Sequence, residues 1–222
     1  MRTALLDLDG TLVDSAALIT EHLSAALASV GRPVPAAELR SFVGPPFETA
    51  LPALGLTEEQ TAAAVTAYRR SYDKVAAMHT PLYPRVPELL QGLADAGIRL
   101  AVATSKPERL ARAITAGVGI AGHFALVGGA DHVGGRVGKA AVVGSVLERL
   151  AVDPTREPTV MVGDRHHDVD GAAEHGIPTV AVTWGYAEPG ELHGAAKVVG
   201  DVDELLDVLT SAAVWSVQPP GH

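Results

Sequence analysis

Two aspartates, Asp7 and Asp9, end an apolar run near the start of the chain and stand directly before Gly10 and Thr11. Because side chains alternate along an extended segment, both carboxylates point to the same side, and Gly10 then lets the chain turn sharply. Two carboxylates at close range repel each other unless a cation or a shared proton offsets the repulsion. An isolated Asp-x-Asp after a strand usually serves a turn or a helix cap, so the pair needs further support before it indicates catalysis.

That support comes from a second acidic group, in which Asp164 ends the apolar run PTVMVGD and Asp168 follows it closely. In open parallel α/β sheets, ligands bind beyond the carboxyl ends of the strands. Converging carboxylates without cysteine favour Mg²⁺, which is held by one or two carboxylates, water and a substrate phosphate. We therefore expect Asp7, Asp9 and Asp164 to face a metal ion and its substrate. Asp168 could steady the metal, or it could only start a helix, where an acidic side chain is favourable by itself.

Two lysines are candidates for charge neutralisation at the same edge. Lys139 begins a helical pattern, where the helix macrodipole disfavours a cation by several tenths of a kcal/mol, so its position invites a functional interpretation. Its ammonium could neutralise phosphoryl oxygens and the attacking carboxylate, although a solvated surface lysine is the plain alternative. Lys106 competes for this role because it too follows an expected strand end, Thr104-Ser105.

The elements that must position these residues form an α/β pattern. Short, continuous apolar runs suit strands buried on both faces of a parallel sheet, and they occupy residues 3–8, 98–104, 124–129, 158–164 and 178–183. Helical patterns lie between the later runs, so the chain from about residue 84 onward is predicted to be a series of βα units. The predicted fold is a Rossmann-like parallel sheet covered by helices.

A long stretch separates the first strand from the second and predicts an insertion. It carries an amphipathic pattern ended by Gly31, and Thr57 and Gln60 have the spacing of a capping box before another helix. We predict a helical domain at residues 15–83 inserted into an α/β core of residues 1–14 and 84–222. Gly97 is expected to cap the helix before the second strand, and residues 217–222 are expected to form an unpacked tail.

The composition argues against several other classes of protein. The 222 residues carry 26 acidic and 17 basic side chains, so no basic face for a nucleic-acid polymer is expected. The absence of cysteine excludes disulfides, thiolate nucleophiles and cysteine-bound zinc. The few residues before Asp7 are too short for a signal peptide or a membrane span, which predicts a cytoplasmic protein without a membrane partner.

Two further patterns are given structural interpretations. GVGIAG, residues 117–122, fits a dinucleotide-binding motif but follows a helical run, so a helix stop and turn is expected. His166 and His167 could suggest a transition-metal site, but adjacent histidines do not easily converge on one ion. We expect them to be loop histidines.

Taken together, these motifs resemble a known family. DLDGTLVDS, VATSKP, the GK at 138–139 and VGDRHHDVDGA follow the order found in the haloacid dehalogenase superfamily, and the chain is similar to its phosphoglycolate phosphatase-like branch. YPRVPELLQGLADAGI and WGYAEPGEL extend the likeness, and the helical insertion looks like that branch's cap domain. Many relatives have Asn in place of Ser105 and Gly in place of Arg85, which leaves the substrate open.

The resemblance implies a role for each matching residue. Asp7 would be the nucleophile and Asp9 the general acid and then the general base. Thr104 would bind the transferring phosphoryl group and Lys139 would balance its charge. The resemblance implies that Mg²⁺ is held by Asp7, the backbone carbonyl of Asp9, Asp164 and Asp168.

The residues expected to contact the substrate are Gly10, Thr11, Ser105, Lys106 and Arg40. Gly10 and Thr11 would also begin a mobile turn that couples cap movement to the site. Arg40 begins the loop RSFVGPPFE, whose two prolines limit its freedom, and its guanidinium could meet a carboxylate or a second phosphate; a plain connector is the alternative.

The predicted function is Mg²⁺-dependent hydrolysis of a small phosphorylated metabolite, such as phosphoglycolate or a nucleotide or sugar phosphate, by a monomer or homodimer. A dehalogenase is disfavoured because that chemistry needs no acid at Asp9 to protonate an alcohol. A sugar phosphomutase or a pyrophosphatase on the same scaffold remains an alternative. A phosphoaccepting signalling domain also uses strand-end aspartates, but it has no use for a cap.

Overall fold

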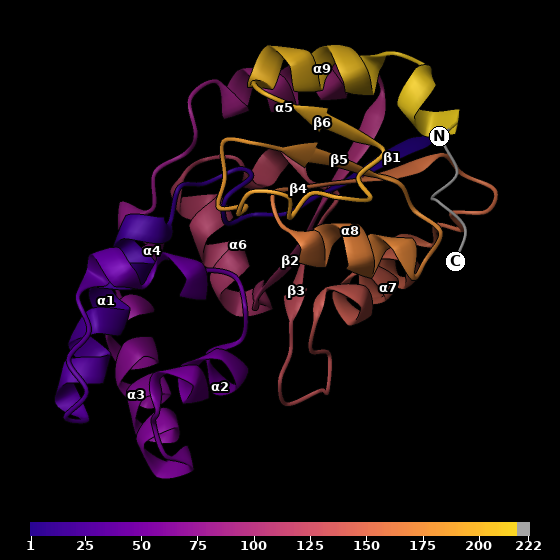
Figure 1. Ribbon diagram of the computed structural model, residues 1–222. Coiled ribbons are helices and arrows are strands. Elements are labelled where there is room, and N and C mark those ends of the chain that lie inside the picture. Colours follow the sequence, from indigo (N-terminus) through magenta and orange to yellow (C-terminus); the bar gives the residue numbers. More distant parts are fainter. Residues whose placement is uncertain (217–222) are drawn as a thin grey trace.

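The computed structural model describes residues 1–216 and contains a six-stranded parallel sheet (Figure 1). The strand order is β3-β2-β1-β4-β5-β6, which confirms the predicted Rossmann-like α/β fold. The strands are β1 (Arg2–Leu6), β2 (Ile98–Pro107), β3 (Leu126–Ala130), β4 (Thr159–Gly163), β5 (Thr179–Val182) and β6 (Lys197–Val199). The order reverses between β1 and β4, where a crevice opens at the carboxyl ends of the strands.

Helices cover both faces of the sheet. Helices α5, α6 and α9 pack with one apolar cluster, and α7 and α8 pack with a second cluster on the opposite face (Figure 1). These helices are α5 (Val86–Asp95), α6 (Glu108–Gly117), α7 (Lys139–Leu150), α8 (His166–Ala173) and α9 (Val202–Thr210). Ala4 and Leu6 of β1 belong to the first cluster and Leu5 to the second, so burial on both faces explains the continuous apolar runs.

A helical segment lies between β1 and α5 and extends from one end of the sheet (Figure 1). It contains α1 (Ala16–Ser29), α2 (Phe47–Ala50), α3 (Glu58–Tyr72) and α4 (Ala76–His79), and α1 packs against α3. Residues 1–216 also contain five short 3-10 helices, of which the first three lie in the helical segment: η1 (Ala36–Glu38), η2 (Arg40–Phe42), η3 (Leu51–Leu54), η4 (Ala121–His123) and η5 (Ala213–Ser216). The predicted capping box is present, with Thr57 accepting from the Gln60 N–H and Gln60 accepting from the Thr57 N–H.

Several local predictions are confirmed by backbone geometry. The helix predicted from Lys139 begins at that residue and ends at Leu150. Gly97 follows α5 with φ 71°, and Gly119 follows α6 with φ 80°, as expected for glycines that end helices. The predicted unpacked tail, residues 217–222, lies outside the described residues.

Two local predictions differ from the structure. The short strand β6 was not predicted, because three residues at the sheet edge, two of them exposed, leave too little periodicity to detect. His166 and His167 lie in the first turn of α8, so the prediction of loop histidines is wrong. Within residues 1–216, no helix is long and apolar enough to cross a membrane.

Candidate active site

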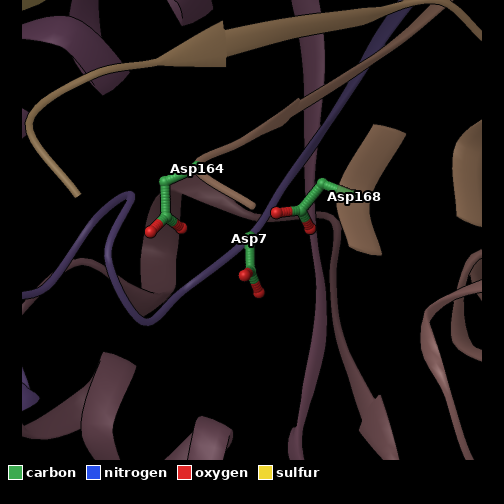
Figure 2. Close-up of side chains that lie close together, drawn as sticks. All are labelled: Asp7, Asp164 and Asp168. Atoms are coloured by element: carbon green, nitrogen blue, oxygen red, sulfur yellow. The ribbon is translucent and has the colours of Figure 1, made fainter. Parts of the chain in front are cut away.

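Three buried carboxylates converge at the carboxyl end of the sheet (Figure 2). Asp7 follows β1 and Asp164 follows the adjacent strand β4, while Asp168 lies in the first turn of α8. One oxygen from each lies within 4.8 Å of the others, and the exposed fractions of Asp7, Asp164 and Asp168 are 8%, 0% and 1%. The strand reversal between β1 and β4 therefore brings together acidic groups that are far apart in the sequence.

A buried lysine neutralises only part of this charge. Lys139 Nζ lies 2.9 Å from Asp7 Oδ1 and 2.7 Å from Asp168 Oδ1, and it donates a 3.0 Å hydrogen bond to the carbonyl of Ala103. Burial raises the pKa of Asp7 to about 6, although Lys139 acts to lower it. Burial, followed by the neighbouring charges of Asp168 and Asp7, raises the pKa of Asp164 well above its usual range.

The donor set fits a divalent cation. Three carboxylates face one ammonium, because Asp7 Oδ1 and Asp168 Oδ1 share Lys139 Nζ as their partner and Asp164 has no cation paired with it among residues 1–216. An uncompensated buried carboxylate is costly, and a hard cation with oxygen ligands would offset that cost. The residues that could hold it are Asp7, Asp164 and Asp168.

The Asp164 carboxylate is held by residues from two other segments. Thr11 Oγ1 donates a 3.2 Å hydrogen bond to Asp164 Oδ1, and the backbone N–H of Tyr186 donates a 2.7 Å hydrogen bond to Asp164 Oδ2. Gly10 has φ 83°, and a Cβ at Gly10 or at Gly185 would collide with this carboxylate. Small residues are therefore required on two sides of Asp164.

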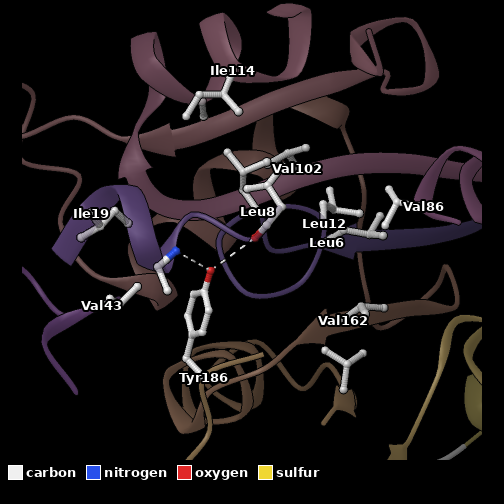
Figure 3. Close-up of a cluster of buried hydrophobic side chains, with 14 of the residues drawn as sticks. Leu6, Leu8, Leu12, Ile19, Val43, Val86, Val102, Ile114, Val162 and Tyr186 are labelled. Atoms are coloured by element: carbon white, nitrogen blue, oxygen red, sulfur yellow. Dashed lines mark hydrogen bonds between the residues drawn. The ribbon is translucent and has the colours of Figure 1, made fainter. Parts of the chain in front are cut away.

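Sequence reasoning did not identify Tyr186 as part of the site. Its hydroxyl oxygen accepts hydrogen bonds from the backbone N–H groups of Ser15, at 2.8 Å, and Ala16, at 3.0 Å. It thereby ties the segment after β5 to the start of α1. Figure 3 shows the Tyr186 side chain among the buried apolar side chains of the core. The signal in the sequence was the position of WGY directly after an expected strand end.

Asp9 has surroundings different from those of Asp7. Its side chain accepts a 2.5 Å hydrogen bond from Ser15 Oγ, and Lys106 Nζ donates to its two oxygens at 2.9 and 2.8 Å. Asp9 is not part of the group of three carboxylates. The two candidate lysines are thus divided, since Lys106 pairs with Asp9 and Lys139 pairs with Asp7.

The remaining candidate residues are arranged around this crevice. Thr104 is buried within β2 (Ile98–Pro107), which pairs with β1, and its Oγ1 accepts a 3.3 Å hydrogen bond from the Lys106 N–H. Ser105 lines two cavities, of about 120 and 310 Å³, the second of which also includes Lys139. Arg40 lies outside the linings of both, with its guanidinium 5.5 Å from the centre of the Tyr186 ring.

A buried ion pair connects the core to the helical segment. Arg165 Nε lies 2.5 Å from Glu191 Oε1, and Arg165 Nη1 donates a 2.7 Å hydrogen bond to the carbonyl of Val43. His166 Nδ1 lies 2.5 Å from the same Glu191 oxygen. Burial opposes ionisation of Glu191, but the hydrogen bond from Arg165 prevails and the pKa of Glu191 falls to about 2. His166 therefore has a structural partner.

Comparison with known proteins explains this arrangement. Residues 4–182 match the family described as haloacid dehalogenase-like hydrolase, and this range contains both pairs of acidic residues. The chain belongs to the haloacid dehalogenase-like hydrolase family. For a hydrolase of this family, the cluster of Asp7, Asp164 and Asp168 implies a divalent metal site.

Individual relatives of this hydrolase carry different names. The tyrosine-protein kinase PtkA of Mycobacterium tuberculosis is 43% identical over 208 residues, which cover 91% of this chain and 70% of PtkA. A 5'-nucleotidase of Pseudomonas aeruginosa is 33% identical over 211 residues, covering 93% of this chain and 95% of the relative. The crystal structure of a predicted phosphatase from Clostridium acetobutylicum superposes with a TM-score of 0.86 at 34% identity, covering 94% and 97% of the two chains.

Proposed function

We propose that the protein is a Mg²⁺-dependent phosphatase that hydrolyses a small phosphomonoester through an aspartyl-phosphate on Asp7. The observation that supports this proposal is the separation of the two aspartates. Asp7 lies among carboxylates that could hold a metal ion, and Asp9 lies outside that group, where it can exchange a proton with a leaving group. One carboxylate for attack and another for proton transfer are the two groups that this reaction needs.

The proposed reaction has two steps. A carboxylate oxygen of Asp7 attacks phosphorus, the bond to the leaving oxygen breaks, and Asp9 donates a proton to that oxygen. Asp9 then takes a proton from water, which attacks the aspartyl-phosphate and releases inorganic phosphate with Asp7 regenerated. Bound by Asp7, Asp164, Asp168 and the Asp9 carbonyl, Mg²⁺ would reduce the repulsion between the Asp7 carboxylate and the phosphate.

The neighbouring cations and hydroxyl groups assist these steps. Thr104 would donate a hydrogen bond to the phosphoryl group and Lys139 would balance its charge, in addition to pairing with Asp7. Lys106 donates hydrogen bonds to both side-chain oxygens of Asp9 and would orient Asp9 toward the leaving oxygen.

The helical segment is proposed to act as a cap, with domain boundaries at residues 15–83 and a core of residues 1–14 and 84–222. The lining of the 120 Å³ cavity supports this role, because it includes Tyr72 from α3 and Lys106 from the core. Closure of the segment over the site would exclude bulk water during transfer to Asp7.

The test of the proposed function is a panel of phosphate esters with released phosphate as the readout. The panel contains phosphoglycolate, nucleoside monophosphates, sugar phosphates, pyrophosphate and p-nitrophenyl phosphate, each with Mg²⁺ and with a chelator. We expect release that requires Mg²⁺. The absence of release from every compound, with Mg²⁺ present, would refute the phosphatase assignment.

A phosphomutase or pyrophosphatase on the same scaffold makes different products. A mutase retains the phosphoryl group and returns it to the sugar, whereas a pyrophosphatase releases phosphate only from pyrophosphate within the panel. A second candidate function is transfer to an acceptor other than water, supported by the 43% identity to PtkA. Label from γ-³²P-ATP on a tyrosine-containing acceptor, without release of free phosphate, would favour that candidate.

The raised pKa values predict that Mg²⁺ binding depends on pH. Asp7 has a pKa of about 6, and the pKa of Asp164 is also raised, so both bind protons more readily than free carboxyl groups. Because a cation binds their ionised forms, the affinity for Mg²⁺ should fall as the pH drops below 6, by about tenfold per pH unit for each proton displaced. Calorimetry in two buffers of different ionisation enthalpy should detect proton release when Mg²⁺ binds at pH 6. An affinity for Mg²⁺ that does not change between pH 5 and pH 8 would contradict this prediction.

Arg40 is proposed to contact a second anionic group in those substrates whose second anion extends beyond the 120 Å³ cavity, because Arg40 lies outside the lining of that cavity. No ion pair to Arg40 is found among residues 1–216; its Nη2 donates a 3.5 Å hydrogen bond to the carbonyl of Gly185, and the guanidinium is free to meet an anion. We expect Arg40→Ala to lower kcat/KM for such substrates by about three- to tenfold and to spare singly phosphorylated neutral esters. The matched control is Arg32→Ala, an exposed arginine of the same segment outside both cavities. Unchanged relative rates in Arg40→Ala would show that Arg40 does not select substrate.

A further inference from the structure

The cavity beside Asp9 is the place for the leaving group. It has a volume of about 120 Å³, lies between the helical segment and the sheet, and includes Asp9 in its lining. Because Asp9 is proposed to protonate the leaving oxygen, the group attached to that oxygen must occupy this cavity. Benzene fits a protein cavity of about 150 Å³, so a space of this order that opens to solvent could receive one six-membered ring.

One side of the cavity is an aromatic wall formed by Phe47, Tyr68 and Tyr72. The Phe47 ring meets Tyr68 edge-on, with centroids 4.7 Å apart, and Tyr68 stacks on Tyr72 with centroids 5.0 Å apart. Lys106 Nζ, which holds Asp9, lies 5.0 Å from the centre of the Tyr72 ring. The aromatic wall thus runs from Phe47 to the side chains that hold the catalytic acid.

The core contributes both polar and apolar residues to the rest of the lining, and Asp9, Ser105, Lys106 and His132 are the polar ones. Pro107, Leu110 and Val137 are apolar residues of this part of the lining. A flat ring in the cavity could contact carbon atoms of these side chains as well as the aromatic wall. Contacts between aromatic rings stabilise a complex by more free energy than the burial of their apolar surface alone would give.

The charges in the cavity argue against an anionic leaving group. Its described lining contains one lysine and one arginine, and both are paired. Lys106 pairs with Asp9, and Arg69 Nη2 lies 2.6 Å from Glu48 Oε1. Asp73 adds a further carboxylate to the lining and is paired with Arg109, and the lining also contains one histidine, His132. A carboxylate such as that of phosphoglycolate would therefore enter a space where no lysine or arginine is free to receive it.

We infer that the substrate carries an uncharged leaving group built on a single aromatic ring, which lies against the aromatic wall while Asp9 protonates its oxygen. This inference rests on the proposed phosphatase function and names the substrate class of the same site.

The test compares esters whose leaving oxygens have similar chemistry. Benzyl phosphate and cyclohexylmethyl phosphate both release a primary alcohol of similar size, and only the first has an aromatic face. We expect kcat/KM for benzyl phosphate to exceed that for cyclohexylmethyl phosphate by about three- to tenfold. Benzyl phosphate should also exceed phosphoglycolate by at least about tenfold, since an unpaired buried charge is the more costly defect.

A variant of the aromatic wall tests the cause of this preference. Phe47→Leu keeps an apolar side chain but removes one of the three rings of the wall, and it should lower the ratio of the two rates toward one. The matched control is Phe42→Leu, which changes a partly buried phenylalanine outside the cavity lining and should keep the wild-type ratio. Inhibition of the wild-type enzyme by benzylphosphonate and cyclohexylmethylphosphonate gives the same comparison without a substitution, and the benzyl compound should bind more tightly.

The outcomes separate this inference from the proposed function. Hydrolysis of the esters with equal or lower kcat/KM for benzyl phosphate, or with phosphoglycolate as the best substrate, would overturn the aromatic leaving group and leave the phosphatase intact. A Phe47→Leu variant that is folded and keeps the benzyl preference would overturn the role of the wall. No phosphate release from any ester, including p-nitrophenyl phosphate, would refute the proposed function itself.

Discussion

Asp7→Asn is expected to abolish turnover of every phosphate ester, lowering kcat by about 10⁴-fold or more. The amide is a poor nucleophile, so no aspartyl-phosphate forms. The substitution also removes one of the three carboxylates that could hold the metal and a partner of Lys139. Phosphate release measured with the panel of esters, at saturating Mg²⁺, tests this prediction.

Loss of chemistry can be distinguished from loss of folding. Burial raises the pKa of Asp7, so the ionised form is disfavoured in the folded protein, and a neutral Asn should leave the metal-free fold at least as stable at neutral pH. Thermal unfolding without metal at pH 7.5 measures this. Asp207→Asn is the matched control, because Asp207 is exposed on α9, outside the candidate site, and it should keep activity within about twofold. Wild-type activity in Asp7→Asn would overturn the assignment of the nucleophile.

Asp9→Asn should slow transfer in a way that depends on the leaving group. Asn can still accept a hydrogen bond from Ser15 and Lys106, but it cannot donate a proton to the leaving oxygen as Asp9 is proposed to do. General acid-base help is typically worth about 10² to 10⁴-fold, so alkyl phosphates should lose this factor. p-Nitrophenyl phosphate should lose much less in the transfer step, because its leaving group needs little protonation. Equal losses of the transfer rate for both types of ester, in single-turnover assays, would contradict the role of general acid.

The same variant should reveal the covalent intermediate. With p-nitrophenyl phosphate, transfer to Asp7 continues while hydrolysis lacks its general base, so an acyl-phosphate should accumulate in Asp9→Asn. Hydroxylamine sensitivity and mass spectrometry of the peptide that contains Asp7 detect it. The adduct should be absent from Asp7→Asn. Labelled phosphate found on His166 or His167 instead would assign the nucleophile to a histidine.

Patterns between residues close in the sequence predicted much of the fold. The apolar runs, the helix that begins at Lys139 and the capping box of Thr57 depend on neighbours along the chain, so their signals survive without knowledge of the tertiary structure. Strand β6 escaped detection because an exposed edge strand of three residues has almost no such signal. The histidines of α8 were misplaced because an adjacent pair carries no helical period.

The candidate site was predictable as a set of residue types and strand ends, but its internal pairing was not. Asp7, Asp164 and Lys139 each stand at an expected terminus, and the motif order indicated their family before any geometry was known. Which lysine serves which aspartate was decided by the tertiary structure. Lys106 reaches Asp9 across 97 residues of sequence, because β2 lies beside β1 in the sheet.

The sequence by itself therefore determined the α/β class, the family and the identity of the acidic residues, since each depends on local periodicity or on side-chain chemistry. Only the tertiary structure decided that Tyr186 holds Asp164 and, from 171 residues away, the backbone of Ser15, and that the aromatic wall stands beside Asp9. These contacts join segments whose separation is set by strand order and by the packing of the helical segment. No pattern along the sequence encodes the distance between these segments in space, because that distance results from the packing of the complete hydrophobic core.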